Sequence, residues 1–152
     1  MDSPTTTEPH EPWGDSGAWN RHLGLRMTEL SGDRVTGEWD VDARHFQPYG
    51  IVHGGVYCSV IETVCSVGAA LSVIGEGLSV VGLDNHTSFV RAVRGGRLTV
   101  VATPITRGRR TQLWEAEIKN EAGQIVATGR VRCLCLAPGT ELAGKAVGTT
   151  DG

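Results

Sequence analysis

A single acidic side chain, Glu62, interrupts a strongly apolar stretch that runs from His53 to Gly75. A carboxylate buried without a partner costs several kcal/mol, as other unpaired buried ions do. Glu62 is therefore either satisfied by hydrogen bonds within the core or kept basic for chemistry. From burial alone, both the structural and the catalytic interpretation stay open.

The sequence His53-Gly54-Gly55 stands where a loop is expected to enter the helix that carries Glu62. Glycines there leave the first backbone N–H groups accessible, and the helix dipole favours negative charge at that end. The motif would suit an oxyanion hole, and it would equally suit an ordinary glycine-rich helix start. Gly55 and Glu62 are roughly 10 Å apart along a helix axis, too far to contact one reacting carbonyl. If they cooperate, Gly54 or Gly55 of one subunit should act with Glu62 of another.

Cys58 and Cys65 fall on the same helix face as Glu62, so a metal site or a cysteine nucleophile has to be considered. Their spacing matches no familiar zinc pattern, and no histidine lies one helical turn from either cysteine. The cysteines, at positions 58, 65, 133 and 135, include no CxxC pair and lie in apolar runs. We therefore expect reduced core residues and no bound metal.

An arginine-rich segment, residues 91–110, contains six arginines and no acidic residue in a chain whose net charge is −3. Guanidinium groups bind phosphate in a bidentate manner, so this segment is a candidate anion site. Solvated charges at hairpin ends are the other interpretation, which suits Arg94 and Arg97 beside a tight turn. No aromatic residue is interleaved for base stacking, so a small polyphosphate is a better candidate than nucleic acid.

The chain of 152 residues is 39% hydrophobic and 20% charged, which is typical of one globular domain. The acidic N-terminal stretch has no apolar core, so we expect no signal peptide and a cytoplasmic protein. The apolar stretch approaches the length of a membrane span, but Glu62 and several Ser, Thr and Gly residues favour a buried helix. Residues 1–18 and 137–152 are rich in small and turn-forming residues and are expected to be flexible tails of a single domain, 19–136.

Hydrophobic periodicity predicts one helix and six strands. Two strands, at 22–30 and 34–41, precede a helix over 55–73 that is apolar on nearly every face and should be enclosed. Short glycine-containing links then favour an antiparallel meander of four strands, at 78–93, 97–106, 111–119 and 124–136. One helix would cover one face of this sheet, and the open sheet edges would favour dimerisation.

Two stretches, PYGIVHGGVYCSVIETVCSVGAA and LDNHTSFVRAVRGGRLTVVATPITRGRRTQLWEAEI, resemble the hotdog-fold acyl-CoA thioesterases. The phenylacetic-acid-pathway type and the 4-hydroxybenzoyl-CoA thioesterases are the branches they resemble, over roughly residues 20–136. The resemblance rests on HGG, an acidic residue nine positions after the histidine, an NHxSFxR-like strand and a GRR-like hairpin in combination. It implies an α+β hotdog fold: an antiparallel β-sheet wrapped around one long central helix, with dimerisation by sheet extension.

The resemblance also implies roles for individual residues. Glu62 would be the general base or the nucleophile, and the Gly54 N–H of another subunit would polarise the thioester carbonyl. Gln47, six residues before His53, would orient the reacting group. His53 would support the loop, and Ser66 keeps a hydroxyl one turn past Glu62. The residues expected near the substrate's CoA portion are Gly55, Asn85, His86, Arg91, Arg107, Arg109 and Arg110.

The activity expected from this resemblance is hydrolysis of an aryl- or medium-chain acyl-CoA to the free acid and CoA. No cofactor is expected besides the CoA of the substrate, and no membrane or nucleic-acid partner. A homodimer or a dimer of dimers would share its active sites between subunits. A non-catalytic acyl-CoA-binding hotdog protein is the alternative, but it would tolerate the loss of Glu62 or Gln47. A hotdog hydratase would need an Asp and His pair that the sequence does not offer.

Overall fold

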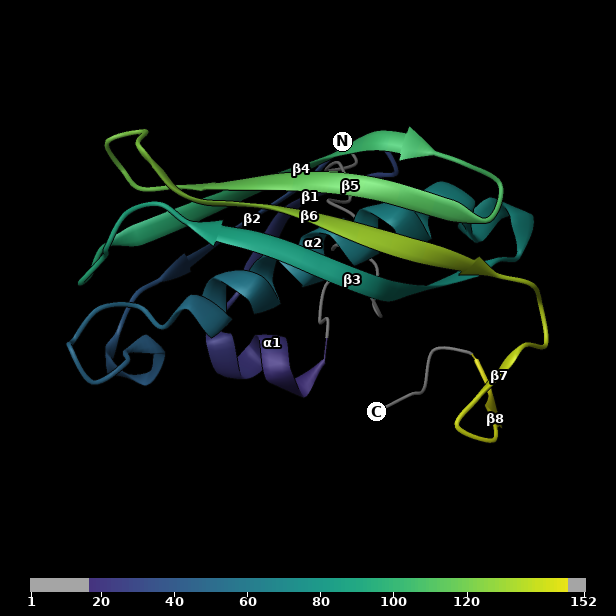
Figure 1. The fold of residues 1–152 in the computed structure, drawn as a ribbon, viewed down its shortest axis with the longest axis horizontal. Coiled ribbons are helices and arrows are strands. Elements are labelled where there is room, and N and C mark those ends of the chain that lie inside the picture. The colour runs from purple at the N-terminus through teal and green to yellow at the C-terminus, as the bar shows by residue number, and fades with distance from the viewer. Residues whose placement is uncertain (1–16, 148–152) are drawn as a thin grey trace, which may run out of the picture.

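The computed structural model describes residues 17–147 and contains an antiparallel six-stranded sheet laid over one long helix, α2 (Gly54–Val73). Figure 1 shows the helix beneath the sheet, whose strand order is β1-β2-β4-β5-β6-β3. The strands are β1 (Arg26–Leu30), β2 (Val35–Asp40), β3 (Ser79–Phe89), β4 (Arg97–Arg107), β5 (Thr111–Lys119) and β6 (Ile125–Leu136). The expected hotdog architecture is thereby confirmed.

The last four strands do not form the meander that the sequence pattern predicts. β3 pairs with β6, whereas β4 pairs with β2 and β5. The link through Gly95 and Gly96 is therefore not a hairpin, because it carries the chain from the edge of the sheet to its interior. Short glycine-containing links have similar sequences whether they close a hairpin or cross between strands, so the prediction was wrong here.

The strand predicted at residues 22–30 begins later, because Ala18–Leu23 form a short helix, α1, that ends at Gly24. This helix lies on the side of α2 that faces away from the sheet (Figure 1). There the Thr63 hydroxyl of α2 donates to Asn20 Oδ1 over 2.8 Å. α1 therefore covers part of the helix face that the sheet leaves open.

The core forms between the inner sheet face and α2. Buried and more exposed residues alternate along β5, as they do in a strand with one covered face. The largest fully buried side chains include Trp39, Trp114, Ile61, Leu98 and Ile118. The stretch Gly54–Glu76 is long and apolar enough to span a membrane by length and composition, with a mean hydropathy of 1.7. Half of it is buried inside the fold, as in the core helix of a globular domain.

α2 is not enclosed on every side, so this sequence prediction was wrong for the single chain. Glu62 is exposed, and Cys58, Ser59, Thr63 and Ser66 are only partly buried. A single sheet covers a single face of a helix, which leaves the opposite stripe open. Glu62 is therefore a solvent-facing carboxylate in one copy of the chain, and the expected desolvation does not arise within that copy.

All four cysteines are free thiols, as predicted. Cys65 and Cys133 are buried, and burial raises the pKa of both thiols, which keeps them protonated and weakly nucleophilic. Among the described residues, no group of three or more His, Cys, Asp or Glu side chains is placed to hold a metal ion.

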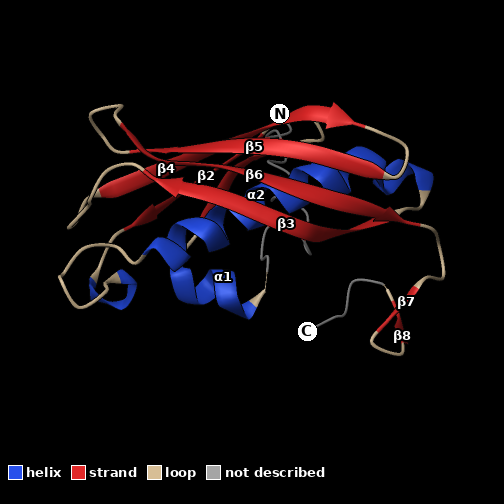
Figure 2. Cartoon of the chain, in the orientation of Figure 1, coloured by secondary structure: helices blue, strands red, loops and turns tan. Residues whose placement is uncertain are grey.

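Short elements complete the fold, as Figure 2 shows. Two 3₁₀ helices, η1 (Ala43–His45) and η2 (Ile74–Glu76), lie before and after α2. The predicted C-terminal tail contains a small antiparallel hairpin of β7 (Glu141–Leu142) and β8 (Lys145–Ala146). The remaining residues of the two predicted tails, 1–16 and 148–152, lie outside the described residues.

Candidate active site

The loop that leads into α2 is closed into a compact hairpin by backbone hydrogen bonds. The His53 N–H donates to His45 O over 2.8 Å, and the Gln47 N–H donates to Ile51 O over 2.9 Å. Gly50 has a φ of +72°, a conformation that glycine adopts without strain and that the tight turn after Gln47 requires. The loop therefore presents Gln47 at the tip of a hairpin that runs directly into the helix.

His45, which the sequence pattern did not single out, anchors the base of this loop. Its buried ring accepts the Asp42 N–H at Nδ1 over 3.0 Å, and its Nε2 lies 2.8 Å from Leu23 O. A backbone N–H only donates and a carbonyl oxygen only accepts, so the ring is the neutral tautomer with its proton on Nε2. The spacing of Asp42 and His45 is that of a capping box, but the contact with Leu23 depends on the folded chain.

The Gln47 side chain is held in one orientation by its own loop. Its Oε1 accepts the Tyr49 N–H. Because a backbone N–H only donates, the atom of the Gln47 amide that faces Tyr49 is the oxygen. Both Nε2 protons of Gln47 therefore take no part in this hydrogen bond. Such protons can hydrogen-bond a carbonyl oxygen or a carboxylate.

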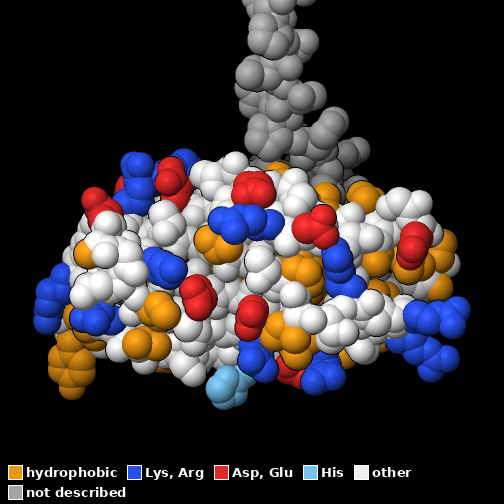
Figure 3. All heavy atoms as spheres, turned by 90° about the horizontal axis from the view of Figure 1, so that it is seen from above, with side chains coloured by type: hydrophobic (Ala, Val, Ile, Leu, Met, Phe, Trp, Pro, Cys, Tyr) orange, Lys and Arg blue, Asp and Glu red, His pale blue; other side chains and the backbone are white. Residues whose placement is uncertain are grey.

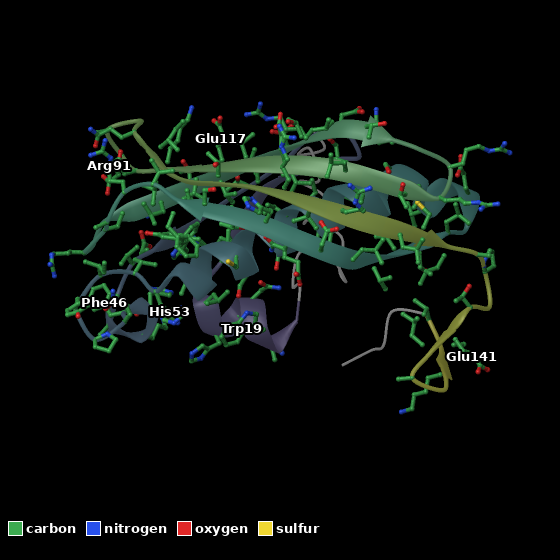
Figure 4. The ribbon with its side chains drawn as sticks, in the orientation of Figure 1. Trp19, Phe46, His53, Arg91, Glu117 and Glu141 are labelled. Atoms are coloured by element: carbon green, nitrogen blue, oxygen red, sulfur yellow. The ribbon has the colours of Figure 1, made fainter. Side chains whose placement is uncertain are left out.

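The first turn of α2 begins at Gly54, with His53 as its N-cap. His53 Nδ1 accepts the Gly55 N–H over 2.8 Å, so that donor is occupied. Within residues 17–147 no hydrogen bond occupies the Gly54 N–H. Of the two glycines considered from the sequence, Gly54 is thus the one whose N–H is available to an oxyanion. Figure 4 labels His53, and Phe46 of the preceding loop, at this end of the molecule.

Two aromatic rings border this helix start. A Cβ on Gly54 would lie 2.3 Å from two ring carbons of Phe89, so a larger residue fits at this position only if the ring moves. The Phe89 ring also packs on Tyr57, with 6.1 Å between ring centroids. Among the described residues the buried Tyr57 hydroxyl has no hydrogen-bond partner, and burial raises its pKa to about 12. These rings give the Gly54 N–H an apolar border suited to an acyl or aryl group.

Glu62 lies eight residues after Gly54, about 12 Å further along the helix axis. In the part of the chain that the structure describes, its carboxylate has no ion-pair or hydrogen-bond partner. Ser66, one turn later, is partly buried. A single chain therefore does not bring Glu62 and the Gly54 N–H to one carbonyl.

β3 places the two predicted CoA-contact residues Asn85 and His86 on opposite faces of the sheet. Asn85 Nδ2 donates to Cys58 O of α2 over 2.9 Å, and Asn85 Oδ1 accepts the Thr87 hydroxyl over 2.7 Å. Its amide thus ties the strand to the helix. His86 instead lines a cleft of about 360 Å³ on the outer face, together with charged residues of β5 and β6. Figure 3 shows this face, where acidic and basic side chains are interspersed.

The arginine-rich segment is divided between the two ends of α2. Arg91 belongs to the loop after β3, which lies at the Gly54 end because the Val52 N–H donates to Val93 O over 2.9 Å. The β4–β5 hairpin lies at the other end, where Ser72 and Arg109 line a cleft of about 520 Å³. Gly54 and Ser72 are about 27 Å apart along the helix. Within one chain, Arg91 is therefore not brought together with the hairpin arginines Arg107, Arg109 and Arg110.

Arg94 and Arg97, whose charges were expected only to be solvated, both have protein partners. Arg97 pairs with Asp40 at 3.0 Å, and its hydrogen bond holds the pKa of Asp40 below the ordinary value. Arg94 donates to two carbonyl oxygens of the loop before α2. Arg107 pairs with Asp33 at 2.8 Å. Among the described residues, the arginines of the segment whose side chains have neither a hydrogen-bond nor an ion-pair partner are Arg91, Arg109 and Arg110.

Comparison with known proteins shows consistent similarity to esterases and thioesterases. Residues 49–127 match the family model of the thioesterase superfamily. A candidate esterase of Mycobacterium tuberculosis is 44% identical over 116 residues, which are 75% of this chain and 83% of that protein. The proofreading thioesterase EntH of Cronobacter turicensis is 36% identical over 110 residues, 72% of this chain and 80% of EntH. The solved structure of a Haemophilus influenzae thioesterase aligns with a TM-score of 0.78 at 33% identity, covering 86% of this chain and 92% of the other.

Proposed function

Because this chain belongs to the thioesterase superfamily and is a thioester hydrolase, we propose that it hydrolyses an aryl- or medium-chain acyl-CoA to the free acid and CoA. The observation that carries this proposal is the available Gly54 N–H beside the rings of Phe89 and Tyr57. A thioester bound there would direct its carbonyl oxygen at the N–H and lay its acyl group along the rings.

The catalytic carboxylate of each site, in this proposal, comes from a second copy of the chain. β3 is a free edge of the sheet, and its Leu83 and Phe89 side chains are 51% and 59% exposed. A long, apolar edge strand beside the open stripe of α2 favours pairing with another copy. Two-fold pairing of β3 would bring Glu62 of the partner subunit toward Gly54. The interface would also remove the carboxylate from water, which strengthens a base.

The proposed reaction begins when Glu62 of the partner subunit takes a proton from a water molecule. The water oxygen adds to the thioester carbon, and the carbonyl oxygen becomes an oxyanion that accepts the Gly54 N–H. A donor of this kind contributes about 10²–10³ to the rate. The C–S bond then breaks, its electron pair leaves with the CoA sulfur, and the proton passes from Glu62 to that sulfur. Direct attack by the carboxylate, followed by hydrolysis of the resulting anhydride, uses the same groups.

Other residues would orient the substrate. The free Nε2 protons of Gln47 suit the thioester carbonyl or the Glu62 carboxylate, and Ser66 would support that carboxylate from the same helix. We propose that CoA phosphates bind Arg91, Arg109 and Arg110, whose side chains have neither hydrogen-bond nor ion-pair partners among the described residues. We further propose that the enzyme works in the cytoplasm, without a cofactor, membrane or nucleic acid.

Thiol release from a panel of acyl- and aryl-CoAs tests this proposal. Wild type should hydrolyse at least one substrate, and Glu62→Ala should stay folded yet lose about a hundredfold or more in kcat, the scale of general-base catalysis. Glu117→Ala is the matched control, because Glu117 lies on the outer sheet face and, within residues 17–147, forms an ion pair only with surface Lys119. Binding of acyl-CoA by the wild type without hydrolysis of any of them would contradict the proposal and favour a non-catalytic acyl-CoA-binding protein.

A further inference from the structure

One guanidinium nitrogen of Arg94 hydrogen-bonds the tip of the loop that carries Gln47. Arg94 Nη1 donates to Tyr49 O over 2.9 Å and to Gly50 O over 3.2 Å. The arginine is 45 residues from Tyr49 in sequence, so the contact joins two separate segments. A hydrogen bond from a charged group to a carbonyl is about twice as strong as a neutral one.

Arg94 projects from a segment that is itself well anchored. The N–H groups of Val90 and Arg91 donate to Val126 O of β6 over 2.8 and 3.1 Å. Val93 O accepts the Val52 N–H over 2.9 Å, immediately before the helix start. Arg94 therefore reaches the loop from a base that is fixed both to the sheet and to the helix entry.

Beyond the backbone hydrogen bonds that close the hairpin, the loop tip has little support from side-chain packing. The Tyr49 side chain is 82% exposed, so it contributes almost no packing. The Tyr49 N–H donates to Gln47 Oε1, while the Tyr49 carbonyl accepts from Arg94. Tyr49 is thus hydrogen-bonded both to the Arg94 guanidinium and to the Gln47 side chain, so a shift of Tyr49 would change the orientation of the Gln47 amide.

We infer that Arg94 is a positioning residue: it fixes the loop tip so that the Gln47 carboxamide keeps its Nε2 protons directed at the thioester. Arg94 acts through Gln47 and does not contact the substrate. The inference rests on the proposed function, which gives Gln47 its role. It differs from a phosphate-binding role, in which the guanidinium would contact the CoA itself and set KM.

A double-mutant cycle tests this coupling with the substrate that wild type hydrolyses best. Arg94→Ala should lower kcat about tenfold and change KM less than about twofold, because it loosens the geometry of a reacting group. In a Gln47→Ala background the same substitution should change kcat less than about twofold, since the group it positions is gone. Arg94→Lys should recover part of the loss by bonding one carbonyl. Arg97→Ala, which removes a neighbouring surface ion pair, is the control and should keep wild-type kcat.

Two outcomes of the cycle would overturn the inference: an equal loss from Arg94→Ala in both backgrounds, or a rise in KM with kcat unchanged. Hydrogen exchange supplies a readout that does not need activity. Residues 46–53 should exchange faster in Arg94→Ala and at the wild-type rate in Arg97→Ala, and unchanged exchange in Arg94→Ala would overturn the inference. A wild type that hydrolyses no thioester would instead overturn the proposed function, and the exchange rates would then decide whether Arg94 fixes the loop.

Discussion

Replacing Gly54 by alanine should slow hydrolysis far more than it destabilises the fold. The added Cβ would lie 2.3 Å from two Phe89 ring carbons, whereas carbon atoms normally approach to about 3.5–4.0 Å. The ring or the helix start must therefore move by at least about 1 Å to restore an ordinary contact. Because Phe89 is 59% exposed, its ring can move outward, and the free energy of unfolding should fall by only about 1 kcal/mol.

Catalysis should respond more strongly, because a misplacement of about 1 Å can cost about a hundredfold in rate. The residue 54 N–H would be moved from the position where the oxyanion develops, and the loss of such a donor costs about 10²–10³ in kcat. We therefore expect kcat for the best substrate to fall about a hundredfold. Thiol release measures this loss, and thermal unfolding followed by circular dichroism measures stability independently.

Phe89→Ala supplies the matched control, because it removes the ring that the new Cβ would meet. The double variant should unfold at the temperature of Phe89→Ala alone and should regain much of the kcat that Gly54→Ala loses. Wild-type kcat in Gly54→Ala would refute the assignment of this N–H to the oxyanion. A slow Gly54→Ala enzyme that Phe89→Ala does not rescue would refute the steric argument.

Three further substitutions test separate parts of the structure. Tyr57→Phe should leave stability at neutral pH unchanged or raise it by about 1 kcal/mol, since within residues 17–147 the buried hydroxyl has no hydrogen-bond partner. Burial raises the pKa of Tyr57 from 10.0 to about 12, so on raising the pH the tyrosine ionises first in the unfolded chain. The free energy of unfolding should therefore fall between these two pH values. In urea titrations Tyr57→Phe should show a smaller fall over the same range. His53→Ala removes the acceptor of the Gly55 N–H and should lower the free energy of unfolding by about 1 kcal/mol, measured with urea; an unchanged value would show that this cap contributes nothing. Leu83→Glu on the free edge of β3 should yield monomers in sedimentation velocity, whereas Ile105→Glu, at another exposed apolar side chain, should stay dimeric; dimers of Leu83→Glu would contradict pairing through β3.

Local periodicity predicted the central helix and four of the six strands of the sheet to within one residue at each end, because one-sided burial leaves alternation in a strand such as β5. The predictions for β1 and β3 were each four residues too long, at the start of β1 and at the end of β3. The pairing of the strands could not be predicted from local periodicity. The partner of β3 is β6, which depends on where the chain crosses the sheet and not on any local pattern. The six-residue helix Ala18–Leu23 is too short for its periodicity to stand out from that of a strand.

The candidate site was partly visible in the sequence. The HGG motif at the helix start and Glu62 on the same helix are local features, and the structure places them as expected along the chain. The exposure of Glu62 was not predictable, because a helix that is apolar on most faces has the same pattern whether a sheet or another copy covers it. The contacts of Arg94 and His45 are with distant backbone carbonyls, which carry no sequence signal at all.

A hybrid dimer tests the shared active site most directly. One subunit carries Glu62→Gln and the other carries Gly54→Ala, and two different affinity tags allow only the hybrid to be purified. If the two residues act across the interface, one site of the hybrid is intact, and thiol release per dimer should be about half that of wild type although both parent homodimers are nearly inactive. If they act within one chain, both hybrid sites are defective. Activity no higher than that of the parents would then contradict the proposed arrangement.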